Sequence, residues 1–272
     1  MTSEFVAPMD ILQRQYRVEA KWSLAIRSAE TTADRSQLYL RAYDELYRDF
    51  PHLQSEPTQR RRKAEKNAAL LRRFADGGTA FLEIGSGRGD LAIRMAGYCR
   101  TVDAIDATAN GLSDPTPANL TFQVGDGSAL PYADGSFDLA FSDQLLEHLH
   151  PDDARLHLEE VRRVLRAGGR YLCLTPNRLN GPHDVSKFFE TEPRGLHLKE
   201  YSREELGRLF LEAGFSDCHF FVSLSQRRIQ IPGFAVTAVE SLLGALPRRS
   251  QRLVGRNLPI RPLLGAAVAG IK

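Results

Sequence analysis

The spacing of hydrophobic side chains divides the chain into stretches with different periods. Across residues 10–75, apolar positions recur every three or four residues, as on one face of an α-helix. One predicted helix should end before Pro51, because proline inside a helix removes a backbone hydrogen bond, and another covers roughly residues 60–74. We therefore expect an N-terminal helical cap over residues 1–75.

From Thr79 onwards the pattern changes to short aliphatic runs that alternate with helical patterns. The predicted strands are residues 80–84, 101–105, 120–124, 137–142 and 170–175. A predicted helix over residues 152–166 should stop at Gly168-Gly169. Alternation of this kind, with an almost wholly apolar first strand, is typical of a parallel sheet covered on both faces. The predicted fold class is therefore α/β, doubly wound and mostly parallel.

The rest of the chain continues this organisation and then changes character. Ser202 and Glu205 form a capping box that opens a helix, and a strand is predicted for residues 215–224. Two short helical patterns follow, separated by prolines at 247 and 259, and residues 264–271 are expected as a final antiparallel edge strand. We therefore expect a core at residues 76–224, and C-terminal helical additions with a last strand at residues 225–272.

Charge distinguishes these stretches more clearly than overall composition does. The 272 residues are 42% hydrophobic and 26% charged, which excludes disordered, collagen-like and coiled-coil chains, and the net charge is only +2. Residues 1–75 carry a net charge of +4, residues 76–175 carry −7 and residues 176–272 carry +5. An acidic middle between basic ends indicates that the three stretches have different roles.

Two basic stretches each allow a simple structural interpretation. The run Arg60–Lys63 is interpreted as the solvated face of a helix. Residues 219–272 carry eight basic side chains and one acid, interspersed with apolar residues. This tail is expected either to pack on the sheet edge with its arginines in solvent or to form an amphipathic surface that contacts a membrane or a lipid-linked substrate.

The cysteine content and the lack of targeting patterns indicate in which cellular compartment we expect the protein. The three cysteines are far apart and form no CxxC motif, so we expect reduced thiols and neither a disulfide framework nor a zinc site. The N-terminus shows no secretory signal pattern, and the longest apolar stretch, residues 231–246, is broken by Pro232 and Gly233. We expect a cytoplasmic protein, with the option of peripheral membrane contact.

The segment Phe81–Asp90, FLEIGSGRGD, places a glycine loop between the first strand and a helix. In doubly wound sheets, ligands bind at the carboxyl ends of such strands. The loop reads G-x-G-x-G and not the G-x-G-x-x-G of dinucleotide sites, with Asp90 where the last glycine would fall, and no Lys-Ser/Thr pair makes it a P-loop. Glu83, at the end of the strand, suits a cationic group.

Three further strand ends carry polar residues. Asp106 can accept from both hydroxyls of a ribose, whereas its rival Asp103 lies earlier in the strand. Asp126 and the following backbone suit a purine edge, and the fourth strand delivers Asp143 into the same cleft. The set predicts a ligand with an ammonium group, a ribose and an adenine but no phosphate.

These motifs resemble the class I S-adenosylmethionine-dependent methyltransferases, and most of all the type 11 group that includes ubiquinone- and menaquinone-pathway enzymes. The matching segments are FLEIGSGRGDLA, VDAID, GDGSALPYADGSFDLAFSDQLLEHL and EEVRRVLRAGGRYLCLTPN, which together cover about residues 79–177. The resemblance implies a Rossmann-like methyltransferase fold with a seven-stranded sheet. It also implies the cofactor S-adenosyl-L-methionine and the product S-adenosyl-L-homocysteine.

The resemblance assigns cofactor contacts residue by residue. The methionine part would be lined by Glu83, Gly85, Ser86, Gly87 and Gly89, the ribose by Asp106 with Ala107, and the adenine by Asp126, Gly127 and Ser128; Asp143, Gln144 and Leu145 would close over the donor. For Gly89 and Gly127 an alternative remains open: they could be needed only for tight helix and turn packing and not for contact with the cofactor.

If the acceptor is a hydroxyl group, a general base is useful, and the catalytic candidates are His148, His183 and His197. Some quinone-pathway relatives carry Glu-x-x-Glu-His at this position, associated with a divalent metal. Here Gln144 replaces the first carboxylate, so no metal ligand is expected, although Asp143 could substitute. The acceptor pocket should come from a lid at residues 176–201 and from aromatic residues of the N-terminal helices, namely Trp22, Tyr39, Tyr43 and Tyr47.

The predicted function is methyl transfer to a small-molecule acceptor, acting on a hydroxyl of a metabolite, a lipid-linked or a saccharide substrate. One alternative is a binding protein that holds the same cofactor without turnover, and a less favoured one is a nicotinamide-dependent oxidoreductase. No nucleic-acid partner is expected, because the fourth strand lacks an Asn/Asp-Pro-Pro-aromatic motif for a flipped base.

Overall fold

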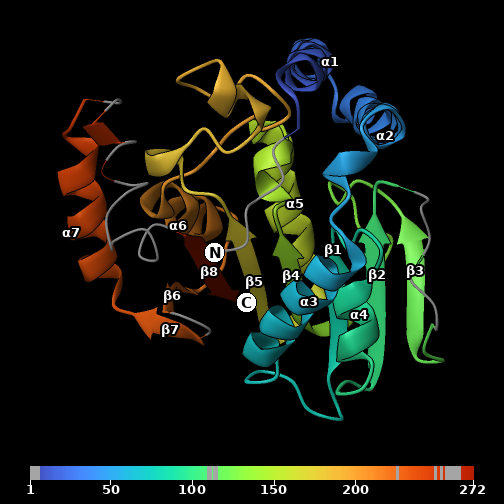
Figure 1. The fold of residues 1–272 in the computed structure, drawn as a ribbon. Coiled ribbons are helices and arrows are strands. Elements are labelled where there is room, and N and C mark those ends of the chain that lie inside the picture. Colours follow the sequence, from blue (N-terminus) through green and yellow to red (C-terminus); the bar gives the residue numbers. More distant parts are fainter. Residues whose placement is uncertain are drawn as a thin grey trace.

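The strands form one mixed sheet of eight strands in the order β3-β2-β1-β4-β5-β8-β6-β7 (Figure 1). This computed structural model describes residues 7–108, 112, 116–224, 227–247, 250–251, 254 and 265–272. The strands are β1 (Ala80–Ile84), β2 (Thr101–Asp106), β3 (Leu120–Val124), β4 (Phe137–Asp143), β5 (Leu165–Thr175), β6 (Asp217–Leu224), β7 (Arg227–Ile231) and β8 (Ala266–Ile271). The first five are parallel, and β8 is antiparallel to both of its neighbours, β5 and β6.

Seven α-helices have both of their ends within the described part of the chain. They are α1 (Met9–Ser28), α2 (Thr32–Asp49), α3 (Pro57–Leu71), α4 (Asp90–Met95), α5 (Pro151–Val164), α6 (Arg203–Glu212) and α7 (Gly233–Gly244). Short 3-10 helices connect them: η1 (Pro51–Leu53), η2 (Leu146–His148), η3 (Arg178–Asn180) and η4 (Val185–Phe188). The predicted capping box is present, with Ser202 and Glu205 each bonding the other's backbone at the start of α6.

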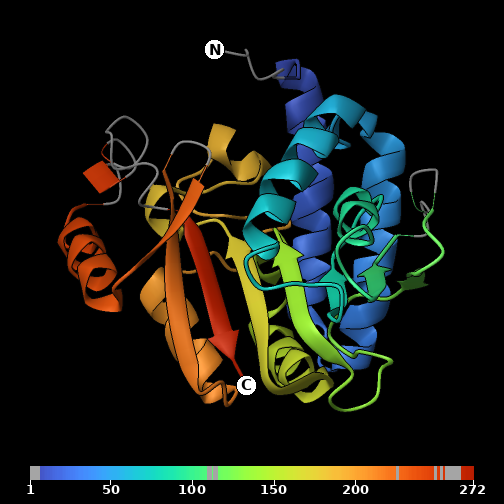
Figure 2. The ribbon, with the colours of Figure 1, turned by 90° about the horizontal axis from the view of Figure 1, so that it is seen from below.

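The helices cover both faces of the sheet (Figure 2). Because successive side chains of a strand point to opposite faces, Phe81 packs with α3 and α4, whereas Leu82 packs with α5 and the N-terminal helices. The doubly wound α/β fold predicted from the sequence is therefore confirmed. The sheet has one strand more than the seven implied by family resemblance, because β7 pairs with β6.

The last strand, β8, is an interior strand and not the edge strand that we expected. It pairs with β5 on one side and with β6 on the other, and Ala267, Val268 and Ala269 are buried. A run of small apolar residues suits a position with neighbours on both sides. The edge strand at this end of the sheet is β7, which was not predicted from the sequence and in which charged and polar residues are interspersed with isoleucine.

The junction between α5 and β5 also differs from expectation. The helix ends at Val164, and β5 begins at the next residue, so Gly168 and Gly169 lie within the strand and do not stop the helix. Gly168 has a φ of +75°, and the pairing of β4 with β5 shifts register between Phe137 and Leu139. The glycines therefore accommodate an irregularity of the strand pair.

The N-terminal helices are anchored to α5 by a buried ion pair. Arg35 of α2 donates two hydrogen bonds to the Asp153 carboxylate, at 2.7 and 2.6 Å, and Tyr39 Oη donates to the same group at 2.7 Å. Both charged side chains are at most 4% exposed. This contact fixes α2, whose later turns carry Tyr43 and Tyr47 over the carboxyl ends of the parallel strands.

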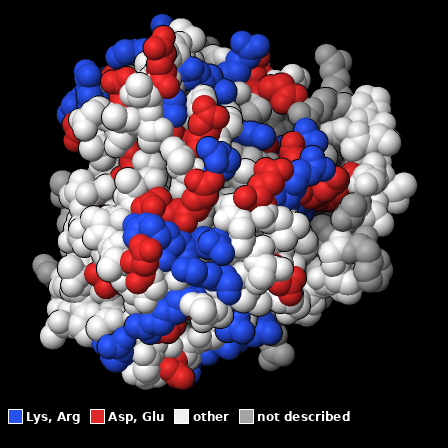
Figure 3. All heavy atoms as spheres, turned by 180° about the vertical axis from the view of Figure 1, so that it is seen from behind, with Lys and Arg blue, Asp and Glu red and all other residues white. Residues whose placement is uncertain are grey.

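On the face covered by α5 and α6, acidic and basic side chains are interspersed (Figure 3). On α5, Arg155 lies 2.6 Å from Glu159, and Arg163 lies 2.7 Å from Glu160. None of the helices in the described ranges combines the length and the apolar character needed to cross a bilayer. The end of the second helical pattern, near Pro259, and five of the eight basic residues of the tail fall outside the described residues.

Candidate functional site

The carboxyl ends of β1, β2, β3 and β4 open into a cavity of about 410 Å³. Its wall is completed by α2, η1, α3 and the loop before α4. Eleven of the residues predicted from sequence line it: Glu83, Gly85, Ser86, Gly87, Asp106, Ala107, Asp126, Asp143, Gln144, Leu145 and His148. Five others, Gly89, Gly127, Ser128, His183 and His197, do not.

The glycine loop after β1 turns sharply into α4. Gly85, Gly87 and Gly89 all have positive φ, between 56 and 74°, a region that residues with a side chain rarely adopt. The amides of Gly85 and Ser86 donate to the carbonyl of Ile105 on β2, at 2.8 and 3.2 Å. The loop is thereby tied to the neighbouring strand while its backbone faces the cavity.

Asp106 closes β2 and organises the loop around it. One carboxylate oxygen accepts from the Gly87 amide at 2.6 Å, and the other accepts from the amide and hydroxyl of Thr108, at 2.9 and 2.7 Å. A carboxylate offers about four acceptor directions, so Asp106 retains capacity toward the cavity. Asp103, its rival for the ribose, is half-buried on the same strand and does not line the cavity.

Glu83 lies at the end of β1 and is only 6% exposed. Burial raises the pKa of its carboxyl group well above the usual range, partly opposed by a hydrogen bond from the Ala92 backbone. Its Oε2 atom is buried and accepts no hydrogen bond in the structure. A cation close to this carboxyl group would favour its charged form.

Asp126 is buried after β3, in a turn that its own side chain stabilises. One carboxylate oxygen accepts from the amide and hydroxyl of Ser128, at 2.9 and 2.8 Å, and Oδ2 is buried without a partner. Gly127 follows with a φ of +80°, and its carbonyl accepts a hydrogen bond from His157 Nδ1 of α5 at 2.8 Å. Gly127 and Ser128 therefore shape the turn, whereas Asp126 borders the cavity.

Residues that sequence reasoning missed reach the cavity from α3. Asn67 donates to Asp143 at 2.7 Å, and Lys63 lies 3.2 Å from the same carboxylate. Arg60 pairs with Asp90 at 2.9 Å. The basic run on α3 is thus not only a solvated face: its first and last members lie at the cavity. Nothing in the helical period of α3 indicates which strand ends it will cover.

Of the four aromatic residues expected in the acceptor pocket, only Tyr43 and Tyr47 line the cavity. Trp22 donates to Glu45 at 3.0 Å, and Tyr39 donates to Asp153. Both are buried in the core between α1, α2 and α5.

Of the three candidate histidines, two lie side by side and the third lies elsewhere. His148 borders the cavity, and its ring meets that of His197 edge-on with centroids 4.7 Å apart. Burial lowers the pKa of His148 to about 3 and that of His197 to about 4. His183 contacts the Asn177 carbonyl and the Asn180 side chain, at 3.1 and 2.9 Å, and does not line the cavity.

Known proteins share this architecture and these motifs. Residues 82–173 match the family model described as a methyltransferase domain. A "Probable S-adenosylmethionine-dependent methyltransferase" of Mycobacterium tuberculosis is 33% identical over 138 residues, which are 50% of this chain and 48% of the relative. A ubiquinone/menaquinone biosynthesis C-methyltransferase of Desulfotalea psychrophila is 31% identical over 51% of this chain and 66% of its own length.

A solved structure supports the fold over more of the chain. The 1,6-didemethyltoxoflavin-N1-methyltransferase of Burkholderia thailandensis superposes with a TM-score of 0.55 at 17% identity, covering 90% of this chain and 91% of its own. This chain spans about half the length of the Mycobacterium relative. The resemblance to class I S-adenosylmethionine-dependent methyltransferases is confirmed, and residues 82–173 form a methyltransferase domain.

Proposed function

We propose that this chain, whose core is a class I methyltransferase domain, transfers a methyl group from S-adenosylmethionine to a hydroxyl of a small-molecule acceptor. The observation that carries the proposal is one cavity at which Glu83, Asp106, Asp126 and Asp143 converge from four strand ends. Four carboxyl groups in one cleft favour a ligand with positive charge and sugar hydroxyls over a phosphate-bearing dinucleotide.

The residues present fit that cofactor. Glu83 Oε2 and Asp126 Oδ2 are buried without hydrogen-bond partners, and buried polar atoms of this kind are normally satisfied. Within the glycine loop, the backbone of Gly87 is open to a close approach, with no atom within 4 Å of the position that a Cβ there would take. An ammonium group and an adenine amine are donors of the kind these oxygens lack.

When bound, S-adenosylmethionine supplies a methyl group on a positively charged sulfur. The chain's own residues contribute position and the exclusion of water, and such alignment can be worth about 7–11 kcal/mol of the barrier. Asp106 and Asp126 would hold the nucleoside end, while Tyr43, Tyr47 and His148 wall the side of the cavity left for an acceptor. Exposed Leu242 and Leu246 on and after α7 support including lipid-linked acceptors among the substrates tested.

The test is the affinity for S-adenosylmethionine measured by calorimetry in Asp106→Ala, with Asp103→Ala as the matched control on the same strand. We expect Asp106→Ala to weaken binding by about 10- to 100-fold, because charge-assisted hydrogen bonds contribute about 1.5–3 kcal/mol. Asp103→Ala should bind as the unchanged protein does. Equal affinities in all three proteins, each shown to be folded by circular dichroism, would remove the ribose assignment.

Two further measurements separate catalysis from binding. Conversion of S-adenosylmethionine to S-adenosylhomocysteine is followed across a panel of metabolite, saccharide and lipid-linked alcohols, and product that requires one of them supports transfer to oxygen. Tight binding of NAD together with no binding of S-adenosylmethionine would overturn the proposal.

A further inference from the structure

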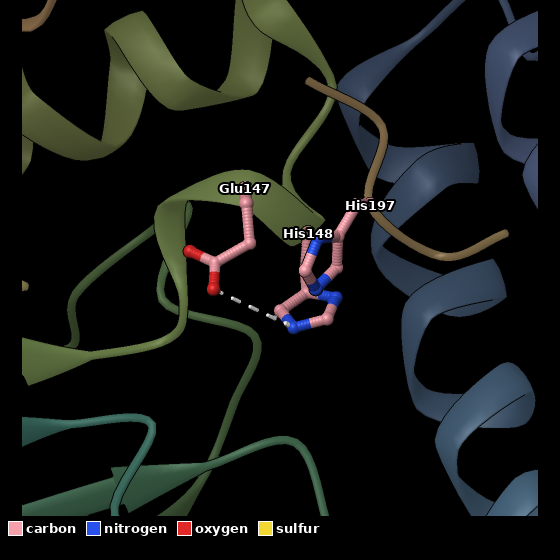
Figure 4. Close-up of side chains that lie close together, drawn as sticks. All are labelled: Glu147, His148 and His197. Atoms are coloured by element: carbon pink, nitrogen blue, oxygen red, sulfur yellow. Dashed lines mark ion pairs between the residues drawn. The ribbon is translucent and has the colours of Figure 1, made fainter. Parts of the chain in front are cut away.

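Glu147, His148 and His197 form a cluster at the edge of the cavity, although His197 is 49 residues further along the chain than His148 (Figure 4). Glu147 and His148 belong to η2, directly after β4, and His197 lies in the segment between η4 and α6. One ligand-type atom from each of the three side chains lies within 4.8 Å of the other two. Among the described residues, this is the cluster whose donor atoms converge in this way.

The hydrogen bonds around the two imidazole rings leave the same nitrogen, Nε2, of each ring available to the cluster. His148 Nδ1 lies 3.0 Å from the Leu196 carbonyl, which can only accept, so Nδ1 carries the proton. His197 Nδ1 lies 2.7 Å from a carboxylate oxygen of Glu200 and is likewise the donor. In the neutral ring, the other nitrogen, Nε2, then has a free lone pair. Metal-binding histidines typically donate their second N–H to a carbonyl or carboxylate in this manner.

Glu147 supplies the third donor atom. Its side chain is completely buried; Oε2 accepts from the Thr175 hydroxyl at 2.8 Å, whereas Oε1 has no hydrogen-bond partner. Oε1 lies 4.0 Å from His148 Nε2. Two atoms bound to one ion at about 2.0–2.2 Å can be up to about 4.4 Å apart, so small side-chain rotations bring these atoms into one coordination sphere.

The segment that carries His197 is held in place by hydrogen bonds to α1 and to η2. The Leu196 amide donates to Glu19 of α1 at 3.1 Å, and Arg27 of α1 donates to the Leu198 carbonyl. The Lys199 amide donates to the carbonyl of Glu147 itself at 3.1 Å. The approach of His197 to Glu147 and His148 is therefore built into the packing of the N-terminal helices.

From this arrangement we propose that Glu147, His148 and His197 bind one divalent transition-metal ion. Two imidazoles and one carboxylate are the donor set that suits zinc, iron, cobalt, nickel and manganese better than calcium or magnesium. Three protein ligands leave coordination positions for an outside oxygen atom. On the proposed methyl transfer, that oxygen would belong to the acceptor, since His148 borders the cavity; metal binding itself does not depend on that function.

This proposal gives His148 and His197 a role as ligands in place of the general-base role predicted from the sequence. Each Nδ1 already donates to a backbone carbonyl or a carboxylate, so an ion bound at Nε2 leaves neither ring a free lone pair with which to accept a proton. The missing carboxylate at Gln144 does not exclude a metal, because His197 enters from a segment that no local motif includes.

The experiment titrates the metal-free protein with Co²⁺ alone, following its visible absorption. We expect one ion per chain, and a loss of affinity of more than about 100-fold in Glu147→Gln and His197→Asn. Asparagine keeps an amide N–H near the position of Nδ1 to donate to Glu200 but lacks Nε2. His183→Asn, in the same segment, is the matched control and should bind Co²⁺ as the unchanged protein does.

A measurement without substitutions guards against variants that fail to fold. X-ray absorption of the Co²⁺-loaded protein should show scattering from two imidazole ligands. The proposal is overturned if the unchanged protein binds no Co²⁺ at one equivalent, if imidazole scattering is absent, or if folded ligand variants bind as tightly as His183→Asn. Calorimetry with S-adenosylmethionine is done separately, so a failed metal site and a failed methyl donor site give different results.

Discussion

The buried side chain of His157 holds the turn after β3, which borders the cavity, through hydrogen bonds. Its Nδ1–H donates to the Gly127 carbonyl at 2.8 Å, so its Nε2 accepts the hydroxyl proton of Tyr171, also at 2.8 Å. Tyr171 then accepts from Ser142 of β4, at 2.6 Å. This directed chain of hydrogen bonds ties the turn after β3 to the middle of the sheet and requires the neutral imidazole.

The free energy of unfolding should therefore fall on acidification through His157. Burial lowers its pKa from 6.5 to about 4, so between these values the unfolded chain binds a proton that the folded chain does not. Stability is then present above pH 6.5 and lost as the pH falls toward 4. Between pH 7 and 5 the loss from this residue should be about 2 kcal/mol. Urea denaturation of the unchanged protein and of His157→Gln at both pH values measures it; equal pH dependence in the two would contradict the assignment.

At the scale of elements, the position of α2 decides what faces the donor site. The ion pair of Arg35 with Asp153, completed by Tyr39, is the buried polar contact between α2 and α5. Tyr43 and Tyr47 follow on the same helix, one and two turns later, and line the cavity. The acceptor side of the cavity therefore depends on a contact some distance away from it.

Breaking that contact from one side should be costly. Asp153→Ala leaves the Arg35 guanidinium buried without its counter-charge, and removal of one partner of such a pair typically costs about 3–5 kcal/mol. Urea denaturation measures the loss. The double variant Arg35→Met with Asp153→Ala should recover a large part of it, because no isolated charge remains buried. A single variant that costs less than about 1 kcal/mol would show that the pair does not anchor α2.

At the scale of the whole molecule, the end of the chain closes the sheet. β8 inserts between β5 and β6, and Lys272 donates to the carbonyls of Arg163 and Leu165 at the far edge of the α5–β5 junction. Gly270 lies against Phe210 and Phe215, where a Cβ would come within 2.5 Å of a ring carbon. The two halves of the sheet are therefore joined by a strand that has no room for a side chain at Gly270.

Gly270→Ala should destabilise the whole protein by about 1–3 kcal/mol through overpacking. Gly265→Ala is the matched control, because a Cβ there meets no atom within 4 Å and the residue directly precedes the same strand. Thermal unfolding followed by circular dichroism compares the two variants. Equal melting temperatures would indicate that β8 packs more loosely than the structure describes.

Some of this architecture is encoded in short segments and could be predicted from them. The strands β1 to β4 were located to within one residue, because a buried strand needs a local apolar run with a turn after it. Glu83, Asp106, Asp126 and Asp143 were predicted to converge, because parallel strands end at one edge of the sheet. The glycine loop followed from the same local rule.

Other features depend on contacts between segments far apart in the chain. The interior position of β8, the reach of Lys63 and Asn67 into the site, and the meeting of His148 with His197 have no local pattern. Each is decided by which apolar faces are buried against each other once all elements are present, a property of the whole core. The sequence by itself thus determined the strand ends that form the methyl-donor half of the site. Only the tertiary structure decided which side chains of other segments face that half across the cavity.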